Sequence, residues 1–478
     1  MHRLLTGIGF FFFFGVELCY ATNVKDFGAR GDGITDDTQA ISLAVSSAKD
    51  GYLEFPKGVY KITRTIWINL IEDGPLGITG TGGSARILMS GEGPAFLFTG
   101  SHQGTADPST VTQVTGDRER MPLISSLEIK GEHVNADGIE IRNVLMPVLK
   151  SVLIRDVRNG VHFTSRNRNI IISDCHIYDA RGIGIFLDKV NIHQMIISNS
   201  HISYCRLGGI NIIGSEIRNL QITGNDIEYN CSENGSHAAD ILIDCSQSGS
   251  VREGTISGNT IQAVPSPSGA NIRFAGLATN PDKIGLFSIT GNHISNQQVN
   301  IQLEHCRGVS ITGNTFIRGY ERHIVFDDCK NIVLTGNVFD HNEDYFPNGL
   351  KASGGITLNN SKGLMVSDNV LDGSGTEESE SDYASVKIKD CEEVILRGMI
   401  IGNNTRRGIH IDNSRSVRMT DCIIGQRRDR KPESIAVMLT GNCDASIVKD
   451  NTIYANKKEA IVNTANGVVV KENTLLDY

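Results

Sequence analysis

Charged side chains recur at matching places in a series of short strand-like segments that begins near Asp137. Apolar and polar residues alternate in each segment, so the apolar side chains point to one side and the residues between them to the other. Aligned on each other, the segments place these outward residues in two columns. Asp244, Glu304 and Asp327 fall in one column, and Arg273 falls in the other between them. If the segments stack about 4.8 Å apart, these four side chains share one surface patch.

Such carboxylates suit the hydrolysis of a glycosidic bond, which needs one carboxyl group as acid and a second as base or nucleophile. Two carboxylates on neighbouring segments raise the pKa of one of them, as a general acid near neutral pH requires. We therefore expect Asp244, Glu304 and Asp327 to be catalytic, without any cofactor. The competing interpretation is that outward positions are simply polar and that their charges pair along the column.

A second chemistry is proton abstraction beside the carboxyl group of a uronic acid. It needs a base such as Lys, Arg or His, and a cation or an Arg that neutralises the carboxylate. Lys387, Lys389 and His410 lie close together toward the C-terminus, with Asp412 beside them. In a lyase of this kind, Ca²⁺ could be the neutralising cation. The residues expected to bind substrate, for either chemistry, are Asn211, Arg273, Gln302, Lys387, Lys389 and His410.

The segments that carry these residues form a repeat. Each unit has one strand, such as IGIFLDK from Ile183 or GGINIIG from Gly208, and a second strand closed by a polar turn, such as LQITGNDI. The units recur every 22 to 34 residues or so, the range in which self-similarity indicates a solenoid. No helix of useful length fits in a unit, and the period-two pattern predicts strands with one buried face. The repeat therefore predicts a parallel β-helix.

The polar turn of the repeat contains an Asn at the same place in most units. We expect these side chains to stack as a hydrogen-bonded ladder and to tolerate a left-handed backbone at a sharp corner. The residues are Asn225, Asn259, Asn292, Asn314, Asn337, Asn369, Asn451 and Asn473. Cys306, Cys329 and Cys391 each follow a strand and predict a small apolar ladder inside the coil.

The N-terminal segment has a different pattern. Residues 23–27 predict a strand, and residues 28–33 a tight Gly-rich loop. Asp36 followed by Gln39 predicts a capping box for a helix that ends near Ala48. Such a helix would cover the open first coil, whose unpaired edge and core would otherwise be exposed.

The run VKDFGARGDGITDDTQAISLAV, followed by YLEFPKGVYKI, resembles the N-terminal segment of the pectate-lyase-like (pectin-lyase-fold) superfamily, which includes polygalacturonases and phage tailspikes. The resemblance implies an all-β, right-handed parallel β-helix, here of roughly 12 to 13 coils with an N-terminal capping helix, and action on polysaccharides. It supplies no catalytic residue. Asn135-Ala136-Asp137-Gly138 is similar to the first polygalacturonase motif, with Ala in place of Thr. The aspartate pair that should follow is replaced by Arg158-Asn159-Gly160-Val161, and the motifs GHG and RIK do not occur.

Composition and the first residues indicate where the protein acts. The formal net charge of -9 argues against nucleic acid or an anionic membrane surface as the main partner. Residues 1–21 predict a signal peptide cleaved after Ala21, so we expect a secreted or periplasmic protein without a membrane anchor. The remainder, 22–478, predicts one domain, with a cap segment at 22–60 and regular repeats over 137–478. After cleavage nine cysteines remain, which we expect to be buried free thiols.

Three functions fit this pattern. The first is an exported enzyme that cleaves glycosidic bonds in a polysaccharide with carboxylates on the outer face of one sheet. The second is a lyase or epimerase acting on a uronic-acid polymer. The third is a non-catalytic carbohydrate-binding or surface β-helix. A polysaccharide is the expected partner in all three, and the protein is expected to be a monomer or a homotrimer.

Overall fold

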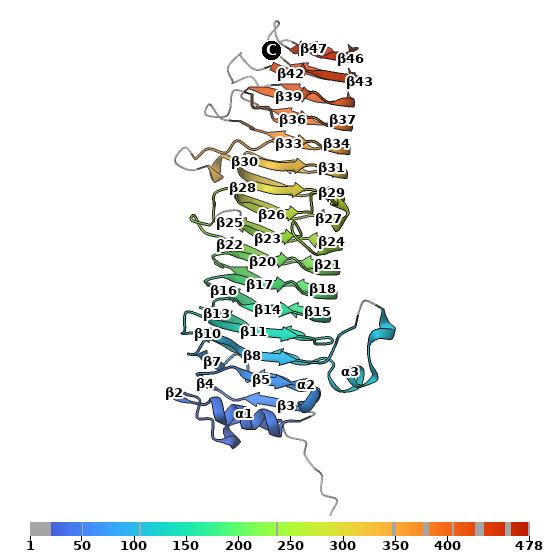
Figure 1. Cartoon of the computed structure of the whole chain (residues 1–478). Helices are drawn as coiled ribbons and strands as arrows, with labels where there is room; N and C mark the ends of the chain where they lie inside the picture. Colours follow the sequence, from blue (N-terminus) through green and yellow to red (C-terminus); the bar gives the residue numbers. More distant parts are fainter. Residues whose placement is uncertain are drawn as a thin grey trace, which may run out of the picture.

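The structure is a computed structural model that describes residues 21–49, 51–104, 107–235, 238–346, 350–375, 382–403, 406–425, 435–454 and 460–476. The chain winds into one elongated stack of coils, with helix α1 (Thr38–Ser47) at one end and the C-terminus at the other (Figure 1). Residues 1–20 of the predicted signal peptide lie outside the described residues. Across the described ranges, no helix is long and apolar enough to cross a membrane.

Each coil contributes a strand to three parallel faces, which the chain visits in the order face 1, face 3, face 2. Face 1 consists of β5 (Ile66–Asn69), β8 (Gly93–Thr99), β11 (Ala136–Arg142), β14 (Val161–Thr164), β17 (Ile183–Asp188), β20 (Gly208–Ile213), β23 (Ala239–Asp244), β26 (Ala270–Ala275), the second halves of β28 (His293–Glu304) and β30 (Thr315–Asp327), β33 (Ile356–Asn359), β36 (Val386–Lys389), β39 (Arg407–Asp412), β42 (Ile435–Thr440) and β45 (Ile461–Asn463).

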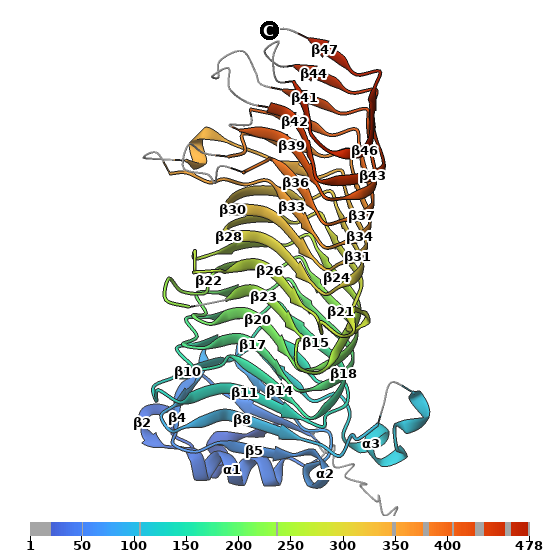
Figure 2. The ribbon, with the colours of Figure 1, turned by 45° about the horizontal axis from the view of Figure 1, so that its top comes forward.

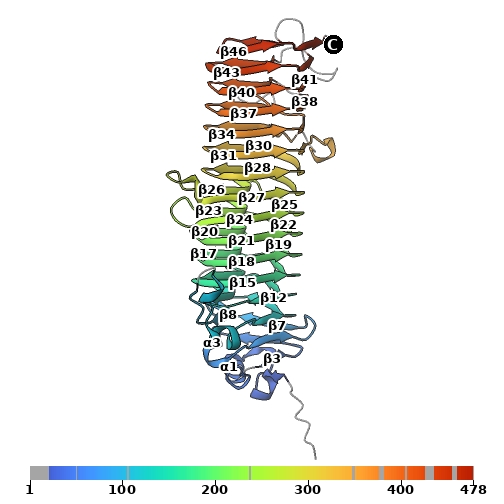
Figure 3. The same cartoon turned by 90° about the vertical axis from the view of Figure 1, so that its right-hand side faces the viewer.

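Face 3 follows face 1 along the chain and is turned toward the viewer in Figure 3. It consists of β1 (Thr22–Asn23), β3 (Tyr52–Phe55), β6 (Gly77–Gly80), β9 (Leu123–Ser125), β12 (Val148–Lys150), β15 (Arg166–Ser173), β18 (Asn191–Ser198), β21 (Glu216–Thr223), β24 (Ser250–Ser257), β27 (Ile284–Thr290), β29 (Arg307–Thr312), β31 (Lys330–Thr335), β34 (Lys362–Ser367), β37 (Glu392–Arg397), β40 (Arg415–Thr420), β43 (Asn442–Lys449) and β46 (Asn466–Lys471).

Face 2 completes the coil with short strands. It consists of β2 (Asp32–Asp36), β4 (Gly58–Ile62), β7 (Ala85–Met89), β10 (Glu128–Gly131), β13 (Leu153–Arg155), β16 (His176–Tyr178), β19 (His201–Ser203), β22 (Asp226–Asn230), β25 (Thr260–Ala263), the first halves of β28 and β30, β32 (Val338–Phe339), β35 (Val370–Asp372), β38 (Ile400–Gly402), β41 (Ile423–Gly425), β44 (Thr452–Tyr454) and β47 (Thr474–Leu476). The sequence repeat predicts only two strands in each unit, because face 2 strands are short and begin directly after the Asn turn.

The parallel β-helix predicted from the repeat is confirmed, and its coils also extend through residues 52–136, before the segment predicted as regular repeats. Inward side chains stack in columns down the core. One column on face 1 is fully buried and joins Ile185, Ile210, Ile241, Ile272, Ile301 and Ile324. Burial of each such side chain stabilises the fold by about 1.5–3 kcal/mol. The nine predicted free thiols are buried and unpaired.

The Asn ladder is confirmed by its hydrogen bonds. Asn259 donates from its backbone N–H and from Nδ2 to Oδ1 of Asn292, at 3.0 and 2.9 Å. Asn292 repeats the pattern with Asn314, and its Nδ2 also donates to the Ile256 carbonyl at 3.0 Å. The expected left-handed backbone belongs to the preceding residue instead, for example Gly291 with φ of 63°. At this turn the Asn thus provides the amide that forms the ladder, and the residue before it adopts the left-handed conformation.

The first coil is covered by α1, as predicted. Ile41, Ala44 and Val45 on one side of the helix are buried against the coil. The helix begins one residue later than predicted, after Asp37, whose carboxylate accepts from the backbone N–H groups of Arg30 and Gly31. The strand predicted over residues 23–27 is wrong. Only Thr22–Asn23 is extended, and Val24–Phe27 forms the 3₁₀ helix η1, capped by the Asn23 side chain.

Two further short α-helices and three 3₁₀ helices lie in the described connections between strands. They are α2 (Leu70–Asp73), η2 (Pro108–Thr110), α3 (Gln113–Arg118), η3 (Pro281–Lys283) and η4 (Glu343–Tyr345). The connection with α3 projects beyond β8 and β11 (Figure 1), and the one with η4 projects from the opposite edge, in orange in Figure 2. The long connections are therefore confined to the corners of the coil.

We expect Asn292→Ala to destabilise the fold, because it leaves two donors of Asn259 and the Ile256 carbonyl without their partner in a dry interior. The expected decrease in the free energy of unfolding is about 3 kcal/mol, measured by chemical denaturation. Asn331→Gly is the matched control, because Asn331 is exposed and has a φ of 55° that Gly adopts freely; the change there should stay within about 0.5 kcal/mol. Equal effects of the two substitutions would contradict a stabilising role of the ladder.

Candidate functional site

The two outward columns predicted from the sequence exist on face 1, with the register that was expected. The first column runs through Asn211, Leu242, Arg273, Gln302, Val325, Thr357, Lys387, His410 and Met438. The second column runs through Ile213, Asp244, Ala275, Glu304, Asp327, Asn359, Lys389, Asp412 and Thr440.

The three predicted catalytic carboxylates lie on this face, and each accepts a local hydrogen bond. Asp244 accepts from the backbone N–H and hydroxyl of Ser246, at 2.9 and 2.6 Å. Glu304 accepts from Nε2 of Gln302. Asp327 accepts from Nδ2 of Asn360 at 3.0 Å. Glu304 and Asp327 are register partners on adjacent strands, whereas Asp244 lies two coils away.

Three of the predicted substrate-binding residues are buried, namely His410, Arg273 and Asn211, and the last two contact the start of their own strands. Arg273 donates through Nη2 to the Ser268 carbonyl, its Nε has no hydrogen-bond partner, and burial lowers the pKa of its guanidinium. Asn211 donates from Nδ2 to the Leu207 carbonyl at 3.4 Å. Both side chains are thus occupied with their own corner of the coil.

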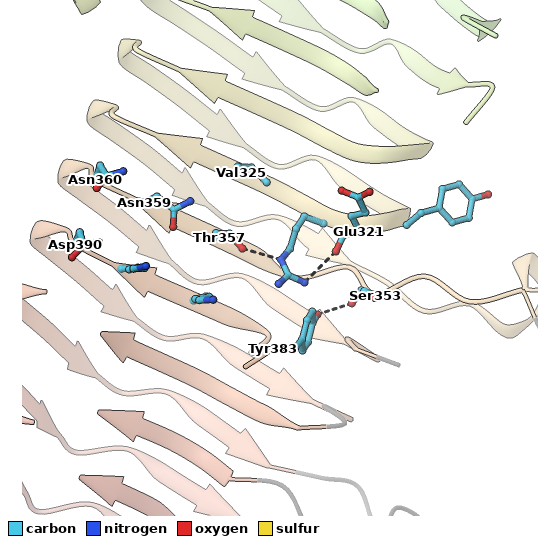
Figure 4. Close-up of a pocket in the computed structure, with 12 residues that line it drawn as sticks. Glu321, Val325, Ser353, Thr357, Asn359, Asn360, Tyr383 and Asp390 are labelled. Atoms are coloured by element: carbon cyan, nitrogen blue, oxygen red, sulfur yellow. Dashed lines mark hydrogen bonds between the residues drawn. The ribbon is translucent and has the colours of Figure 1, made fainter. Parts of the chain in front are cut away.

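A cavity of about 610 Å³ opens on face 1 over β30, β33 and β36 (Figure 4); we call it the Arg322 cavity. Its lining residues are Tyr320, Glu321, Arg322, Val325, Ser353, Thr357, Asn359, Asn360, Tyr383, Lys387, Lys389 and Asp390. It contains Lys387 and Lys389 from the predicted elimination cluster, but none of the three predicted catalytic carboxylates. Asp327 borders it through its hydrogen bond with Asn360.

The guanidinium of Arg322 is fixed in this cavity by its neighbours. Its Nε donates to the hydroxyl of Thr357 at 2.9 Å, and Nη1 donates to the Glu321 carbonyl at 3.1 Å. Its Cζ lies 4.3 Å from the centre of the Tyr383 ring. Nη2 takes no part in these contacts. A guanidinium held in this way is preorganised to receive a carboxylate.

Tyr383 supports Arg322 from within the fold. Its side chain is buried, and its hydroxyl donates to the carbonyls of Ser353 and Gly354 at 2.6 and 3.0 Å. Burial raises the pKa of the Tyr383 hydroxyl to about 12. Tyr383 therefore acts as a positioning residue and not as a base.

The two lysines differ in their pairing. Lys387 forms an ion pair with Asp382, and this contact lowers the pKa of the Asp382 carboxyl. Lys389 is exposed, and its ammonium makes no ion pair or hydrogen bond with any residue in the described part of the chain. The Lys389 ammonium is therefore free to bind an anionic ligand.

His410 neighbours Lys387 in the register but does not line the cavity. The Thr440 hydroxyl donates to Oδ1 of Asp412 at 2.6 Å, so its oxygen accepts from Nε2 of His410 at 2.9 Å. The proton is thereby placed on Nε2, and Nδ1 is buried without a hydrogen-bond partner. Burial, followed by the charge of Arg407, lowers the pKa of His410 and favours the neutral ring.

A buried polar ladder underlies the strands that carry these columns. His323 Nδ1 hydrogen-bonds Oδ1 of Asn300 at 2.6 Å, Asn300 donates to Asn271 at 2.9 Å, and Asn271 donates to Asp240 at 3.0 Å. Asn230 donates to the other oxygen of Asp240 at 3.1 Å. Burial raises the pKa of Asp240 to about 7 and lowers that of His323 to about 3. The ladder ties together the starts of four successive face 1 strands.

Sequence reasoning missed most of the Arg322 cavity. Tyr320, Glu321, Ser353 and Tyr383 lie at corners and in connections, where the period-two pattern does not apply. Arg322 begins the segment RHIVFDDC, but its position precedes the alternating part of the strand. Over the described ranges, no group of three or more His, Cys, Asp or Glu side chains is placed to hold a metal ion.

Comparison with known proteins gives one family and several distant relatives. The family model described as "Right handed beta helix region" matches residues 112–261, 230–378 and 374–477. An Azotobacter vinelandii protein named "Alginate lyase 7" is 31% identical over 122 residues, which cover 24% of this chain and 13% of that protein. A Cochliobolus carbonum "Glucan 1,3-beta-glucosidase" is 51% identical over 48 residues, which cover 10% of this chain and 6% of that protein. The matches thus span only a small part of either relative.

Among solved structures, the Dettilon tailspike protein superposes with a TM-score of 0.51 at 17% identity. The superposition covers 74% of this chain and 68% of the tailspike chain. At this level of identity, the likeness concerns the fold alone.

The buried ladder from His323 to Asp240 predicts how the stability of the fold depends on pH. His323 has an ordinary pKa of 6.5 that falls to about 3 in the folded protein, so the unfolded state binds the proton first on acidification. The neutral His323 ring contributes to the free energy of unfolding, and this contribution is fully present above pH 6.5. It should decrease as the pH falls toward 3. His323→Gln keeps a donor for Asn300 and removes this titration. Relative to the wild type, the variant should gain about 3 kcal/mol between pH 6.5 and about pH 4, measured by denaturant unfolding.

The opposite titration of Asp240 occurs in both proteins and cancels in the difference. Parallel stability curves of wild type and His323→Gln over this range would contradict the prediction.

Proposed function

Because this chain belongs to the right-handed β-helix family, matched over 112–477, we propose that it acts on an acidic polysaccharide lying along face 1, with the Arg322 cavity as the subsite for a uronic acid. The observation that carries the proposal is the pairing of a fixed guanidinium, Arg322, with an unpaired ammonium, Lys389, in one cavity. Two cations of this kind complement a sugar carboxylate in a protein whose overall charge is negative.

The reaction that these groups favour is β-elimination. Arg322 binds the uronate carboxylate and stabilises the negative charge that develops on it when the neighbouring C5 proton leaves. Lys389 binds the carboxylate as the ammonium and, once it has released a proton to the solvent, takes the C5 proton as the amine. The C4–O bond then breaks as the C4=C5 double bond forms, and the leaving oxygen receives a proton from Tyr320, whose side chain lines the same cavity. Return of a proton to C5 from the other side, without bond cleavage, would be the epimerase variant of the reaction.

The relatives are compatible with a polysaccharide substrate, but they do not indicate which polysaccharide it is. A local match to a protein named as an alginate lyase supports a uronic-acid polymer, and a local match to one named as a glucan 1,3-beta-glucosidase supports a neutral glucan. The predicted signal peptide at 1–21 would place the protein in the periplasm or outside the cell, where such polymers occur.

Hydrolysis is the second candidate, favoured by one observation. Glu304 and Asp327 are outward register partners on adjacent strands, and Asp327 is hydrogen-bonded to a residue of the cavity wall. A carboxylate pair about one strand spacing apart falls near the separation of about 5–5.5 Å of retaining glycosidases. In this reaction the cavity would bind the sugar next to the cleaved bond.

The test is to incubate the purified protein with alginate, polygalacturonate and neutral β-glucans, and to follow reducing ends together with the ultraviolet absorbance of unsaturated uronides. New reducing ends with matching absorbance from an acidic polymer support elimination. Reducing ends without absorbance would replace it by hydrolysis, and Glu304→Gln and Asp327→Asn should then abolish activity. Binding of an acidic polymer without either signal, and without a change of uronate stereochemistry by NMR, would leave a binding protein and exclude both enzymes.

We expect Lys389→Ala to weaken binding of the acidic polymer by roughly tenfold to a hundredfold, because one charge-assisted contact with the carboxylate is lost. The melting temperature should not change, because Lys389 is exposed and has no partner among the described residues. Binding is measured by isothermal calorimetry with an oligosaccharide of the polymer. Lys330→Ala is the matched control, an exposed lysine in a strand of face 3. Equal affinities of the two variants would contradict a role of the cavity in binding.

A further inference from the structure

The corner between face 2 and face 1 carries a second column of unusual residues. At this corner one residue in most coils has a left-handed backbone, and those from the N-terminal side up to the Arg322 cavity are Asp156, Asp179, Tyr204, Tyr229, Asn296 and Arg318. Asp and Asn adopt this conformation readily, whereas a bulky aromatic residue does so only at a cost. Tyr204 and Tyr229 are therefore exceptions that local backbone preference does not explain.

The two tyrosines form a stacked pair on the surface. Their ring centres lie 5.5 Å apart with an angle of 7° between the planes. Tyr204 is 53% exposed and Tyr229 39%, so the rings are not part of the core. Gln262 donates from Nε2 to the Tyr229 hydroxyl at 3.4 Å, which fixes the ring on the C-terminal side of the pair.

One ring face of the pair remains accessible. In the coil before Tyr204, the corner position holds Asp179, whose short side chain cannot cover a phenol ring. The backbone bond from the Asp179 N–H to Ser203, at 3.2 Å, shows that the two corners are adjacent. A free aromatic face beside a carboxylate matches a sugar ring, whose C–H groups pack on the aromatic plane while its hydroxyls donate to the carboxylate.

The face 1 strands begin at the left edge in Figure 1. Tyr204 and Tyr229 precede face 1 strands at this edge, as do Tyr320 and Glu321 of the Arg322 cavity. Arg318, in the same corner column, is two residues before Tyr320 of the cavity. Four coils separate Tyr204 from Arg318, which corresponds to about 19 Å along the stack. A polymer chain is long enough to reach both places, and a short oligosaccharide held in the cavity is not.

We propose that Tyr204, Tyr229 and Asp179 form an ancillary carbohydrate-binding site, which holds a distant part of the same polysaccharide chain that enters the Arg322 cavity. The proposal rests on the proposed function for the identity of the chain. Its own ligand chemistry is that of any pyranose with an accessible C–H face, charged or neutral, because the pair contributes an aromatic plane and an acceptor without a cation.

The alternative is that the stack only stabilises its corner, and the choice of substitution separates the two roles. Tyr204→Asn/Tyr229→Asn removes both rings and installs the residue type that tolerates a left-handed backbone. The melting temperature of this variant should be equal to or above that of the wild type. Tyr204→Phe/Tyr229→Phe retains both rings and is the matched control.

With a long acidic polymer as substrate, the Asn variant should raise KM roughly tenfold and leave kcat unchanged, while the Phe variant behaves as the wild type. With oligosaccharides too short to span the two places, all three proteins should be equal, whereas Lys389→Ala should be impaired on both substrates. Unchanged KM of the Asn variant on the polymer would overturn the ancillary site.

The two proposals fail in different ways. If no acidic polymer is bound or turned over by the wild type, the proposed function fails, and retention on immobilised neutral polysaccharides then tests the tyrosine pair directly. Retention of the wild type and the Phe variant, with loss for the Asn variant, would support the ancillary site. Retention that is the same for all three proteins, or absent for all three, would overturn it.

Discussion

The fold depends on the requirement that each coil pair its backbone groups with the coils before and after it. Because all three faces are parallel sheets, the place of a side chain within its own coil also decides which side chains it touches in the next coil. The same rule produces the fully buried Ile column, the Asn ladder and the outward columns of face 1. Structure and site thus follow from one geometric constraint, applied coil after coil.

This constraint explains what the sequence alone could predict. The period-two pattern assigned each outward residue to its column, and the register of Glu304 with Asp327 and of Lys387 with His410 is as expected. The pattern could not reveal face 2, whose strands such as Val338–Phe339 are too short to show alternation. It also misplaced the left-handed residue at the Asn turn, because both the Gly and the Asn there suit a corner.

The candidate site was predictable only in part, for a related reason. A column describes neighbours along a flat face, whereas a cavity needs walls, and those come from the corners. Arg322 stacks on Tyr383, which lies 61 positions further along the chain, in the connection between β35 and β36. The carboxylates that the columns singled out instead accept hydrogen bonds from nearby side chains, as those of Asp244 and Glu304 do.

The connection between β32 and β33 has a broader consequence. It projects from the corner, yet Ile356 directly after it is the register partner of Ile324 in the preceding coil. The backbone N–H groups of Ser353 and Gly354 donate to the carbonyls of Tyr320 and Gly319. Extra residues in this connection therefore do not change the register of the strands. Doubling the length of such a connection costs only about 0.6 kcal/mol in closure entropy. Evolution can therefore lengthen or exchange these connections, and so reshape the surface beside face 1, while the stacked strands keep their stability.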